Sequence, residues 1–174
     1  MERNVRIVKD VEGNKIVIIN DIRFKGRQSI EWDEVETYLK RFIGEVHMIE
    51  STNDMVYIGV DLPEEYAHSN YTITLKGANA KAKANAVQGI PEIIEIAINK
   101  AYKENFKEKH NKDAKYGWYR YDSRFALPVF GRLGEVEKYN VFKVIMIVRH
   151  AENGKLYLYD IMNIKKETST HFQS

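Results

Sequence analysis

The chain has 174 residues, of which 44% are hydrophobic and 30% are charged, and its formal net charge at pH 7 is +2. This composition is typical of a globular protein with a buried core, and it disfavours a disordered chain. The chain contains no cysteine, which excludes disulfide scaffolds, cysteine-based zinc sites and thiol nucleophiles. No apolar run approaches the roughly 18 residues of a membrane helix, and the amino terminus lacks an apolar signal segment. We therefore expect a cytoplasmic protein without membrane contact.

The charges are unevenly distributed along the chain. Residues 1–75 contain 9 basic and 14 acidic side chains, residues 76–120 contain 10 and 5, and residues 121–174 contain 8 and 6. The excess of basic side chains lies after residue 75, and a modest positive charge of this kind favours binding of a polyanion such as a nucleic acid. Basic helices are also common on proteins that bind no nucleic acid, so charge alone leaves both interpretations open.

The first 75 residues predict several short elements. Two strand-like runs, residues 5–9 and 15–19, flank a turn-rich segment and predict a hairpin. Residues 32–42 carry apolar side chains at helical spacing, with acids early, cations late and Gly44 after them, and therefore predict a helix. Residues 46–49 and 55–60 are typical of strands.

Two helices are expected in the middle of the chain. Residues 76–87 are rich in Ala and Lys, which predicts a helix that lies on the surface or packs closely through its alanines. Pro91 suits the first turn of a second helix. An apolar stripe runs from there toward His110 and predicts a long helix that packs on the sheet. The stripe consists of Ile94, Ala97, Ile98, Ala101, Tyr102 and Phe106.

Three strand patterns follow at residues 118–130, 139–149 and 155–165, and we expect them to form an antiparallel meander at the centre of the sheet. The pair Asn153-Gly154 between the last two is the strongest short-range signal for a two-residue hairpin turn. The middle strand is apolar on both faces except at Lys143, so we expect both of its faces to be covered. The expected pairs are Glu152 with Lys155, His150 with Tyr157, Arg149 with Leu158, and Ile147 with Asp160.

Together these elements predict an α+β fold. Its antiparallel sheet has a C-terminal three-stranded meander packed against a long helix, plus a smaller N-terminal αβ portion. We expect residues 1–75 to form that accessory portion and residues 76–174 to form the helices and sheet of the main domain.

Four segments can carry chemistry. His110 lies at the expected end of the long helix among cations, where an imidazole can exchange protons near neutral pH, although a solvated helix end explains it as well. Strand alternation places Trp118, Arg120, Asp122 and Arg124 on one face, where two arginines beside aromatic rings can hold a phosphate and stack a base. Asp122 lies between those arginines, so an internal ion-pair ladder is the alternative.

The other two segments are less specific. Arg149 lies diagonally from Asp160 in the expected register, which favours a structural ion pair, and His150 faces Tyr157 in a structural role. Two cations and several hydroxyls follow the last strand, and Lys166, Thr168 and Ser169 can hold a phosphate there or form a polar tail. The sequence contains no Walker A, G-x-G-x-x-G, H-E-x-x-H or G-x-S-x-G motif, which argues against nucleotide hydrolysis and dinucleotide chemistry. His47 and His68 have no partner at metal-ligand spacing, and we expect no metal site and no cofactor.

The downstream half resembles a known domain. The matching segments are KHNKDAKYGWYRYDSRFALP at residues 109–128, YNVF at 139–142, RHAENGKLYLYDI at 149–161 and KKETS at 165–169. They resemble a domain of Firmicutes prophages and conjugative elements that is often attached to phage head-morphogenesis or large polyvalent proteins. That domain is similar to the broad group of barnase, EndoU, colicin and RelE-like nucleases.

The resemblance implies metal-independent RNA cleavage, in which the 2′-hydroxyl attacks the adjacent phosphate. Such a site needs a base, an acid and cations for the phosphorane charge. Because no glutamate is evidently placed as the base, His110 and His150 would share the acid and base roles. The implied catalytic residues are His110, Arg120, Arg124, His150 and Thr168. The implied substrate-binding residues are Lys109, Trp118, Arg149, Lys166 and Ser169. The alternative is a non-catalytic module that binds RNA or a phage, conjugation or host protein through its basic helices.

Overall fold

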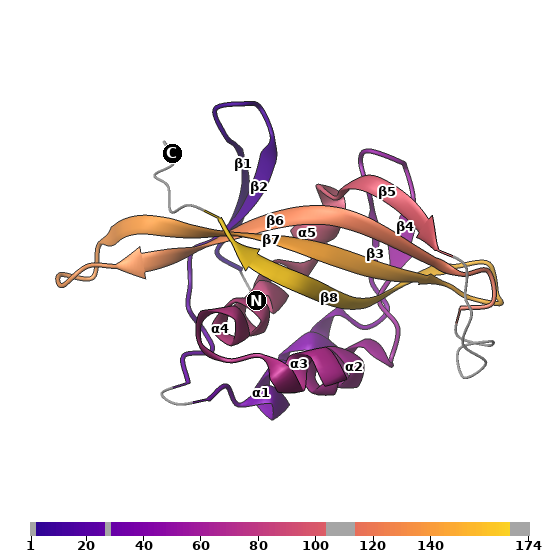
Figure 1. Ribbon diagram of the computed structural model, residues 1–174, viewed down its shortest axis with the longest axis horizontal. Coiled ribbons are helices and arrows are strands. Elements are labelled where there is room, and N and C mark those ends of the chain that lie inside the picture. Colours follow the sequence, from indigo (N-terminus) through magenta and orange to yellow (C-terminus); the bar gives the residue numbers. More distant parts are fainter. Residues whose placement is uncertain (1–2, 27–28, 104–113, 168–174) are drawn as a thin grey trace.

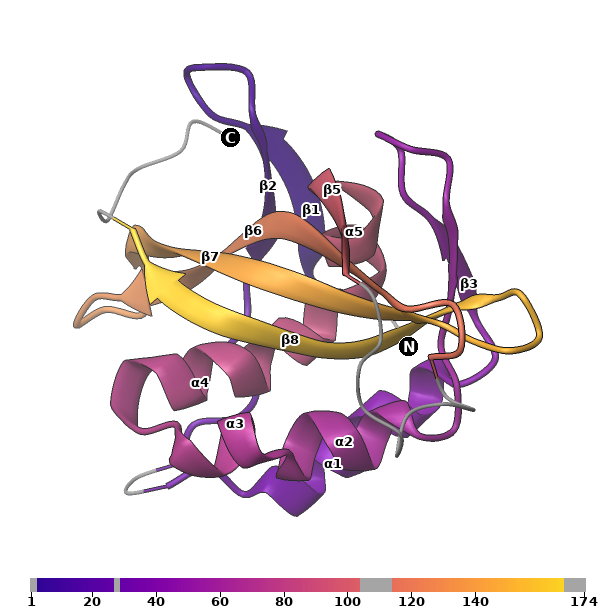
Figure 2. The ribbon, with the colours of Figure 1, turned by 45° about the vertical axis from the view of Figure 1, so that its right-hand side comes forward.

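The computed structural model describes residues 3–26, 29–103 and 114–167. A curled sheet arches over a layer of helices that lies against one of its faces (Figure 1, Figure 2). The strands are β1 (Val5–Lys9), β2 (Lys15–Ile19), β3 (Val46–Met48), β4 (Met55–Tyr57), β5 (Ile98–Lys103), β6 (Trp118–Phe130), β7 (Val136–His150) and β8 (Leu156–Lys166).

The helices are short. They are α1 (Trp32–Leu39), α2 (Leu62–His68), α3 (Asn70–Thr74), α4 (Gly77–Ala86) and α5 (Ile90–Glu95), with 3-10 turns η1 (Lys40–Phe42) and η2 (Val87–Gly89). In the described part of the chain, no helix has the length and apolar character needed to span a membrane. The predicted hairpin near the amino terminus, the helix at residues 32–42 and the strands at residues 46–49 and 55–60 are confirmed within a few residues.

The sheet joins both halves of the sequence in the order β1-β2-β6-β7-β8-β4-β3, and β5 also pairs with β6. The long strands β6, β7 and β8 form the antiparallel meander, as their patterns predict. The two N-terminal hairpins attach to either side of it through parallel pairs, β2 with β6 and β4 with β8. The predicted antiparallel sheet is therefore wrong: the sheet is mixed, because strands from residues 1–75 flank strands from residues 76–174 and join them through these parallel pairs.

The predicted long helix is wrong, and with it the expected packing of a meander against a long helix. Helix α5 ends at Glu95, where the Ala97 N–H donates a hydrogen bond to the Ile94 carbonyl. The chain then continues as β5, which pairs antiparallel with β6. Ile98 is 44% exposed and Tyr102 is 56% exposed, so the apolar stripe does not form one buried helical face. The edge of β6 offers hydrogen bonds to the chain, and these outweigh a helical pattern that is rich in β-branched residues.

The predicted turn between β7 and β8 is one residue too short. The Ala151 N–H donates to the Lys155 carbonyl and the Gly154 N–H donates to the Ala151 carbonyl, so three residues, 152–154, form the loop. Gly154 has a φ of 84°, the left-handed conformation that this loop requires. The pairs at the turn are consequently His150 with Leu156, Arg149 with Tyr157 and Val148 with Leu158.

A bulge then restores the predicted register. Ile147 pairs with Asp160, as expected, because Tyr159 is an extra residue in β8 between two ladder pairs. A second register shift follows near Asn163, whose φ is 52°. Bulges increase local twist and bend the strand, which accounts for the curl of β8 around the helices.

The main core lies between the helices and one face of the sheet. Tyr121 and Phe125 of β6 and Met146 of β7 belong to it, together with residues from four of the helices. Four of the five alanines of α4 are buried and Ala78 in the first turn is exposed, which confirms the expectation that this helix packs closely through its alanines. A second, smaller cluster around Ile16, Ala126 and Val141 covers one end of the opposite face. On this face β7 is therefore covered at that end and at Ile147, which is 9% exposed, but not at Lys143.

Candidate nucleic-acid interface

A row of aromatic and cationic side chains crosses the sheet on the face opposite the helices, which we call the open face. Trp118 of β6 pairs with Arg149 of β7, and Arg149 pairs with Tyr157 of β8. Tyr157 in turn pairs with Tyr57 of β4. Paired residues on neighbouring strands direct their side chains to the same face. Because Tyr121, three residues from Trp118, points into the main core, alternation places the whole row on the open face.

The rings and cations of this row contact one another. The Arg149 guanidinium lies 4.3 Å from the Tyr157 ring centroid, and the Lys155 ammonium lies 4.8 Å from that of Tyr57. The Tyr57 and Tyr157 rings are 5.9 Å apart, and the Asn153 amide donates to the Tyr157 hydroxyl at 2.9 Å. These contacts restrict the orientations of the tyrosine rings, which lowers the side-chain entropy that the protein loses when a ligand binds.

The bulge in β8 adds a further ring to the row. Tyr159 and Trp118 reach across β7 and pack edge to face, with ring centroids 4.9 Å apart. Both side chains are only partly buried. A partly exposed indole beside three partly exposed phenol rings is an arrangement on which bases can stack.

Cations surround these rings. Lys103 pairs with Trp118 from β5, and Arg120 follows on the same face of β6; both are exposed. Among the described residues, no ion pair or hydrogen bond engages the Arg120 guanidinium. Asp61 lies 3.8 Å from Arg149, but its side chain is 75% exposed. We call this set the aromatic platform: Trp118, Tyr159, Tyr157 and Tyr57, with Lys103, Arg120, Arg149 and Lys155.

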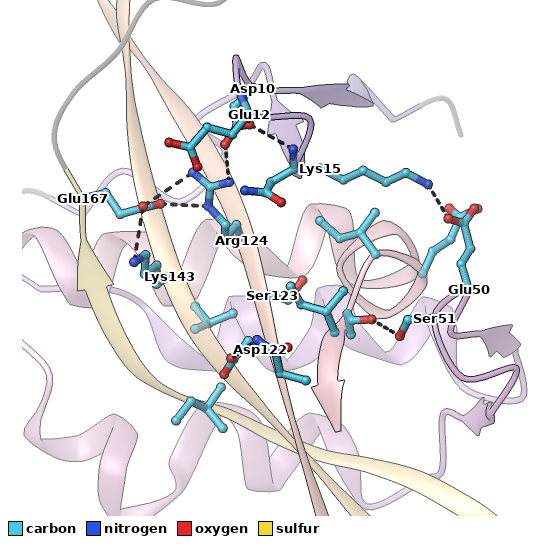
Figure 3. Close-up of a pocket in the computed structure, with 18 of the residues that line it drawn as sticks. Asp10, Glu12, Lys15, Glu50, Ser51, Asp122, Ser123, Arg124, Lys143 and Glu167 are labelled. Carbon is cyan, nitrogen blue, oxygen red and sulfur yellow. Dashed lines mark hydrogen bonds and ion pairs between the residues drawn. The ribbon is translucent and has the colours of Figure 1, made fainter. Parts of the chain in front are cut away.

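The other end of the open face is a groove of about 1030 Å³. It is bounded by the β1–β2 turn, the β3–β4 turn and the start of β5, and β6 and β7 form its floor (Figure 3). Six carboxylates line it and four cations oppose them, so its charge is negative. The acids are Asp10, Glu12, Glu50, Glu95, Asp122 and Glu167, and the cations are Lys15, Arg124, Lys143 and Lys165.

Arg124 lies in this groove and is neutralised by acids. Its guanidinium contacts Asp10 at 2.9 Å and Glu167 at 3.0 Å, as Figure 3 shows. Burial disfavours the charge on Arg124, but the hydrogen bonds to Asp10 and Glu167 outweigh that effect and raise the pKa of Arg124. The hydrogen bond from Arg124 also lowers the pKa of Asp10. A phosphate would have to displace two carboxylates to reach this arginine.

Two further carboxyl groups in the groove, those of Glu50 and Glu95, influence each other's pKa. Burial and then the charge of Glu50 raise the pKa of Glu95, whereas a hydrogen bond from Lys15 lowers the pKa of Glu50. The Lys15–Glu50 ion pair ties the β1–β2 hairpin to the β3–β4 turn. Two carboxyl groups whose pKa values are shifted in opposite directions are a recognised acid–base arrangement, but the negative surroundings disfavour a polyanionic substrate at this place.

The structure brings together only part of the predicted site. Trp118, Arg120 and Arg149 lie on the aromatic platform, while Arg124 lies in the acidic groove on the same face. The predicted alternation of residues 118–124 is confirmed. Lys166 is exposed at the end of β8, beside Phe142. His110, Lys109, Thr168 and Ser169 lie outside the described residues.

Two predicted contacts of the hairpin are wrong. His150 does not face Tyr157; it lies on the other face, where its ring packs 5.1 Å from that of Tyr116 and 5.9 Å from that of Tyr119. Arg149 does not pair with Asp160, because Asp160 is buried against Lys83 of α4, with 2.7 Å between the ammonium and the carboxylate. Sequence reasoning missed this buried pair, and also the roles of Tyr57, Tyr157 and Tyr159. The alternation Tyr157-Leu158-Tyr159 signals two aromatic side chains on one face of a strand.

One cluster in the described part of the chain has metal-ligand chemistry. Asp33 and Glu36 of α1 and His68 of α2 place one ligand atom each within 4.8 Å of the others. His68 contacts Glu36 at 2.8 Å and Asp33 at 3.1 Å, and Asp33 is 92% exposed. A histidine that is hydrogen-bonded to Glu36 and joins two helices accounts for this cluster.

Comparison with known proteins finds no matching family model, no matching curated protein and no matching solved structure.

Proposed function

We propose that the protein binds single-stranded nucleic acid on the aromatic platform. The observation that carries this proposal is the row Trp118–Arg149–Tyr157–Tyr57, which presents aromatic rings and cations together on the open face. Aromatic rings stack on any base, and cations contact the phosphates, so such surfaces bind single strands with little sequence preference. In a duplex the bases are stacked on one another and cannot reach the rings, so single strands are favoured over duplex.

The test is fluorescence anisotropy with a labelled oligouridylate of about eight nucleotides. The wild-type protein is expected to bind at low salt and to bind more weakly as salt is raised. Replacement of Trp118 by Ala removes one stacking surface and is expected to weaken binding about 5- to 150-fold, the equivalent of about 1–3 kcal/mol per base. A DNA or RNA duplex of the same length is expected to bind more weakly than the single strand.

Arg120 gives a matched pair of variants for the phosphate contacts. Arg120→Ala is expected to lower the slope of log affinity against log salt by about 0.7, the value for one phosphate contact on a single strand. Arg132, an exposed arginine in the β6–β7 turn, provides the control, and Arg132→Ala is expected to leave the slope unchanged. Absence of binding at low salt, or equal binding by the wild type and Trp118→Ala, would remove the proposal.

RNA cleavage stays a prediction of the resemblance. Cleavage requires His110 and Thr168, which lie outside the described residues. It also requires Arg124 as a catalytic residue, but the Arg124 guanidinium is held by Asp10 and Glu167. Binding on the platform needs none of these residues. The described geometry therefore supports non-catalytic binding better, but on the sheet and not on the basic helices that the sequence suggests, because residues 98–103 form β5.

A further inference from the structure

Resting on the proposed function, we infer that the platform takes a short single-stranded segment that runs across the strands from β6 to β4, and that the acidic groove prevents it from extending along β6. The bound segment places about two or three bases on the rings. Longer nucleic acids gain little affinity, because their additional phosphates meet carboxylates.

The length of the row sets the number of bases. Neighbouring strands lie about 4.8 Å apart, so a row that crosses β6, β7, β8 and β4 spans about 14 Å. Sheets that bind RNA through aromatic rings stack two or three bases over such a distance. Cations alternate with the rings along this path: Arg149 lies against Tyr157 and Lys155 lies against Tyr57. A strand crossing the sheet therefore meets cations for its phosphates throughout.

A path along β6 meets the opposite charge. Asp122 is the next residue after Arg120 on the open face, and its carboxylate accepts a hydrogen bond from Asn99 at 2.9 Å. Arg124, two residues further, is already paired with Asp10 and Glu167. Glu12 is exposed at the rim of the groove, and no described side chain pairs with it. Phosphates that entered this region would meet six carboxylates and four cations, and Lys143, one of these cations, lies 3.7 Å from Glu167.

The far end of the row is also bounded. Beyond Tyr57 the sheet continues into β3, where Val46 pairs with Tyr57 and Met48 pairs with Met55. These side chains are apolar, and Val46, Met48 and Met55 are 36%, 45% and 45% exposed. Apolar side chains provide no phosphate contact. At this end of the row, Val46, Met48 and Met55 therefore provide no further cation on the open face.

The inference is tested by varying the length of the oligonucleotide. Oligouridylates of about two to ten nucleotides are titrated into the wild type and into the variant Glu12→Gln/Asp122→Asn, which removes two groove charges but keeps the Asn99 acceptor. The wild-type affinity is expected to rise steeply up to about four nucleotides and then to level off. The variant is expected to bind the longest oligonucleotide about three- to tenfold more tightly at low salt and the shortest ones unchanged.

The control variant is Glu64→Gln/Glu137→Gln, which changes the net charge equally at two exposed acids outside the groove. It is expected to give the same length dependence as the wild type. Wild-type affinity that keeps rising with length, or a gain for long oligonucleotides that is equal in both variants, would overturn the inference while leaving binding on the platform intact. Failure of the wild type to bind any length would remove both.

Discussion

Replacing Lys83 with methionine will test whether the buried ion pair stabilises the fold through charge compensation. Lys83 is fully buried in α4, and its ammonium contacts the Asp160 carboxylate at 2.7 Å and the Thr72 hydroxyl at 2.5 Å. The Tyr66 ring lies 4.5 Å from the same ammonium. Removing one partner of a buried pair leaves the other charge uncompensated and costs about 3–5 kcal/mol.

The cost should depend on pH in a defined direction. Burial raises the pKa of Asp160 to about 6, although the attraction of Lys83 opposes the rise, and burial lowers the pKa of Lys83. The folded pKa of Asp160 thus lies above its ordinary value of 3.8, so the stability that its protonated form contributes is lost as the pH rises through about 6. Without Lys83 the pKa of Asp160 rises further, and the folded protein loses more stability on the way to pH 7.5.

Urea unfolding of the wild type and Lys83→Met at about pH 5 and pH 7.5 measures this difference. The loss caused by Lys83→Met is expected to be about 3–5 kcal/mol at pH 7.5 and about 1–2 kcal/mol smaller at pH 5, because one pKa unit is worth about 1.4 kcal/mol. The double variant Lys83→Met/Asp160→Asn contains no buried charge and keeps an acceptor for the Ile161 N–H. It should therefore recover at least half of the loss at pH 7.5.

Lys81→Met is the control, because Lys81 is exposed on the same helix; its effect should stay within about 0.5 kcal/mol. The reasoning is refuted if Lys83→Met costs the same at both pH values, or if the double variant is no more stable than the single one at pH 7.5.

Three further outcomes are expected. Arg124→Ala should destabilise the fold by roughly 1–2 kcal/mol in urea unfolding but leave oligonucleotide affinity unchanged. Because Arg124 lowers the pKa of Asp10, this destabilisation should become smaller as the pH falls through the folded-state pKa of Asp10. Gly154→Ala should cost about 1 kcal/mol in the same assay, because Gly154 holds a left-handed conformation that alanine disfavours. If the ribonuclease prediction is right, the protein will cleave RNA in EDTA and His110→Ala will abolish cleavage, as measured on a denaturing gel; equal cleavage by both proteins would contradict that assignment.

The local patterns of the sequence predict the strands better than their connections. Strand alternation is a property of each segment, so the bounds of β6, β7 and β8 and the faces of residues 118–124 follow from the sequence. The register of β7 and β8 depends on a three-residue loop and on a bulge at Tyr159, and neither has an unambiguous signal. Asn153-Gly154 is typical of a two-residue turn, but a three-residue loop can also use Gly154 at its left-handed position, as here.

The elements that were mispredicted are those whose partner lies far away in the chain. Ile94, Ala97 and Ile98 match helical spacing, but the free edge of β6 pairs with residues 98–103 and draws them into the sheet. Nothing near Lys83 in the sequence indicates that this lysine is buried, because its partner Asp160 is 77 residues away. The aromatic platform likewise depends on Tyr57, which only the parallel pairing of β4 with β8 brings beside Tyr157.

The most direct test of the account is an NMR titration of the isotope-labelled protein with a short oligouridylate. If the aromatic platform is the binding surface, the largest chemical-shift changes will be those of the Trp118 indole N–H and of the backbone amides of Tyr57, Arg149 and Tyr157. The indole N–H resonance of Trp32 in α1 will not move. Shifts confined to the acidic groove, at residues 10–15 and 95–99, or no shifts at all, would contradict the account.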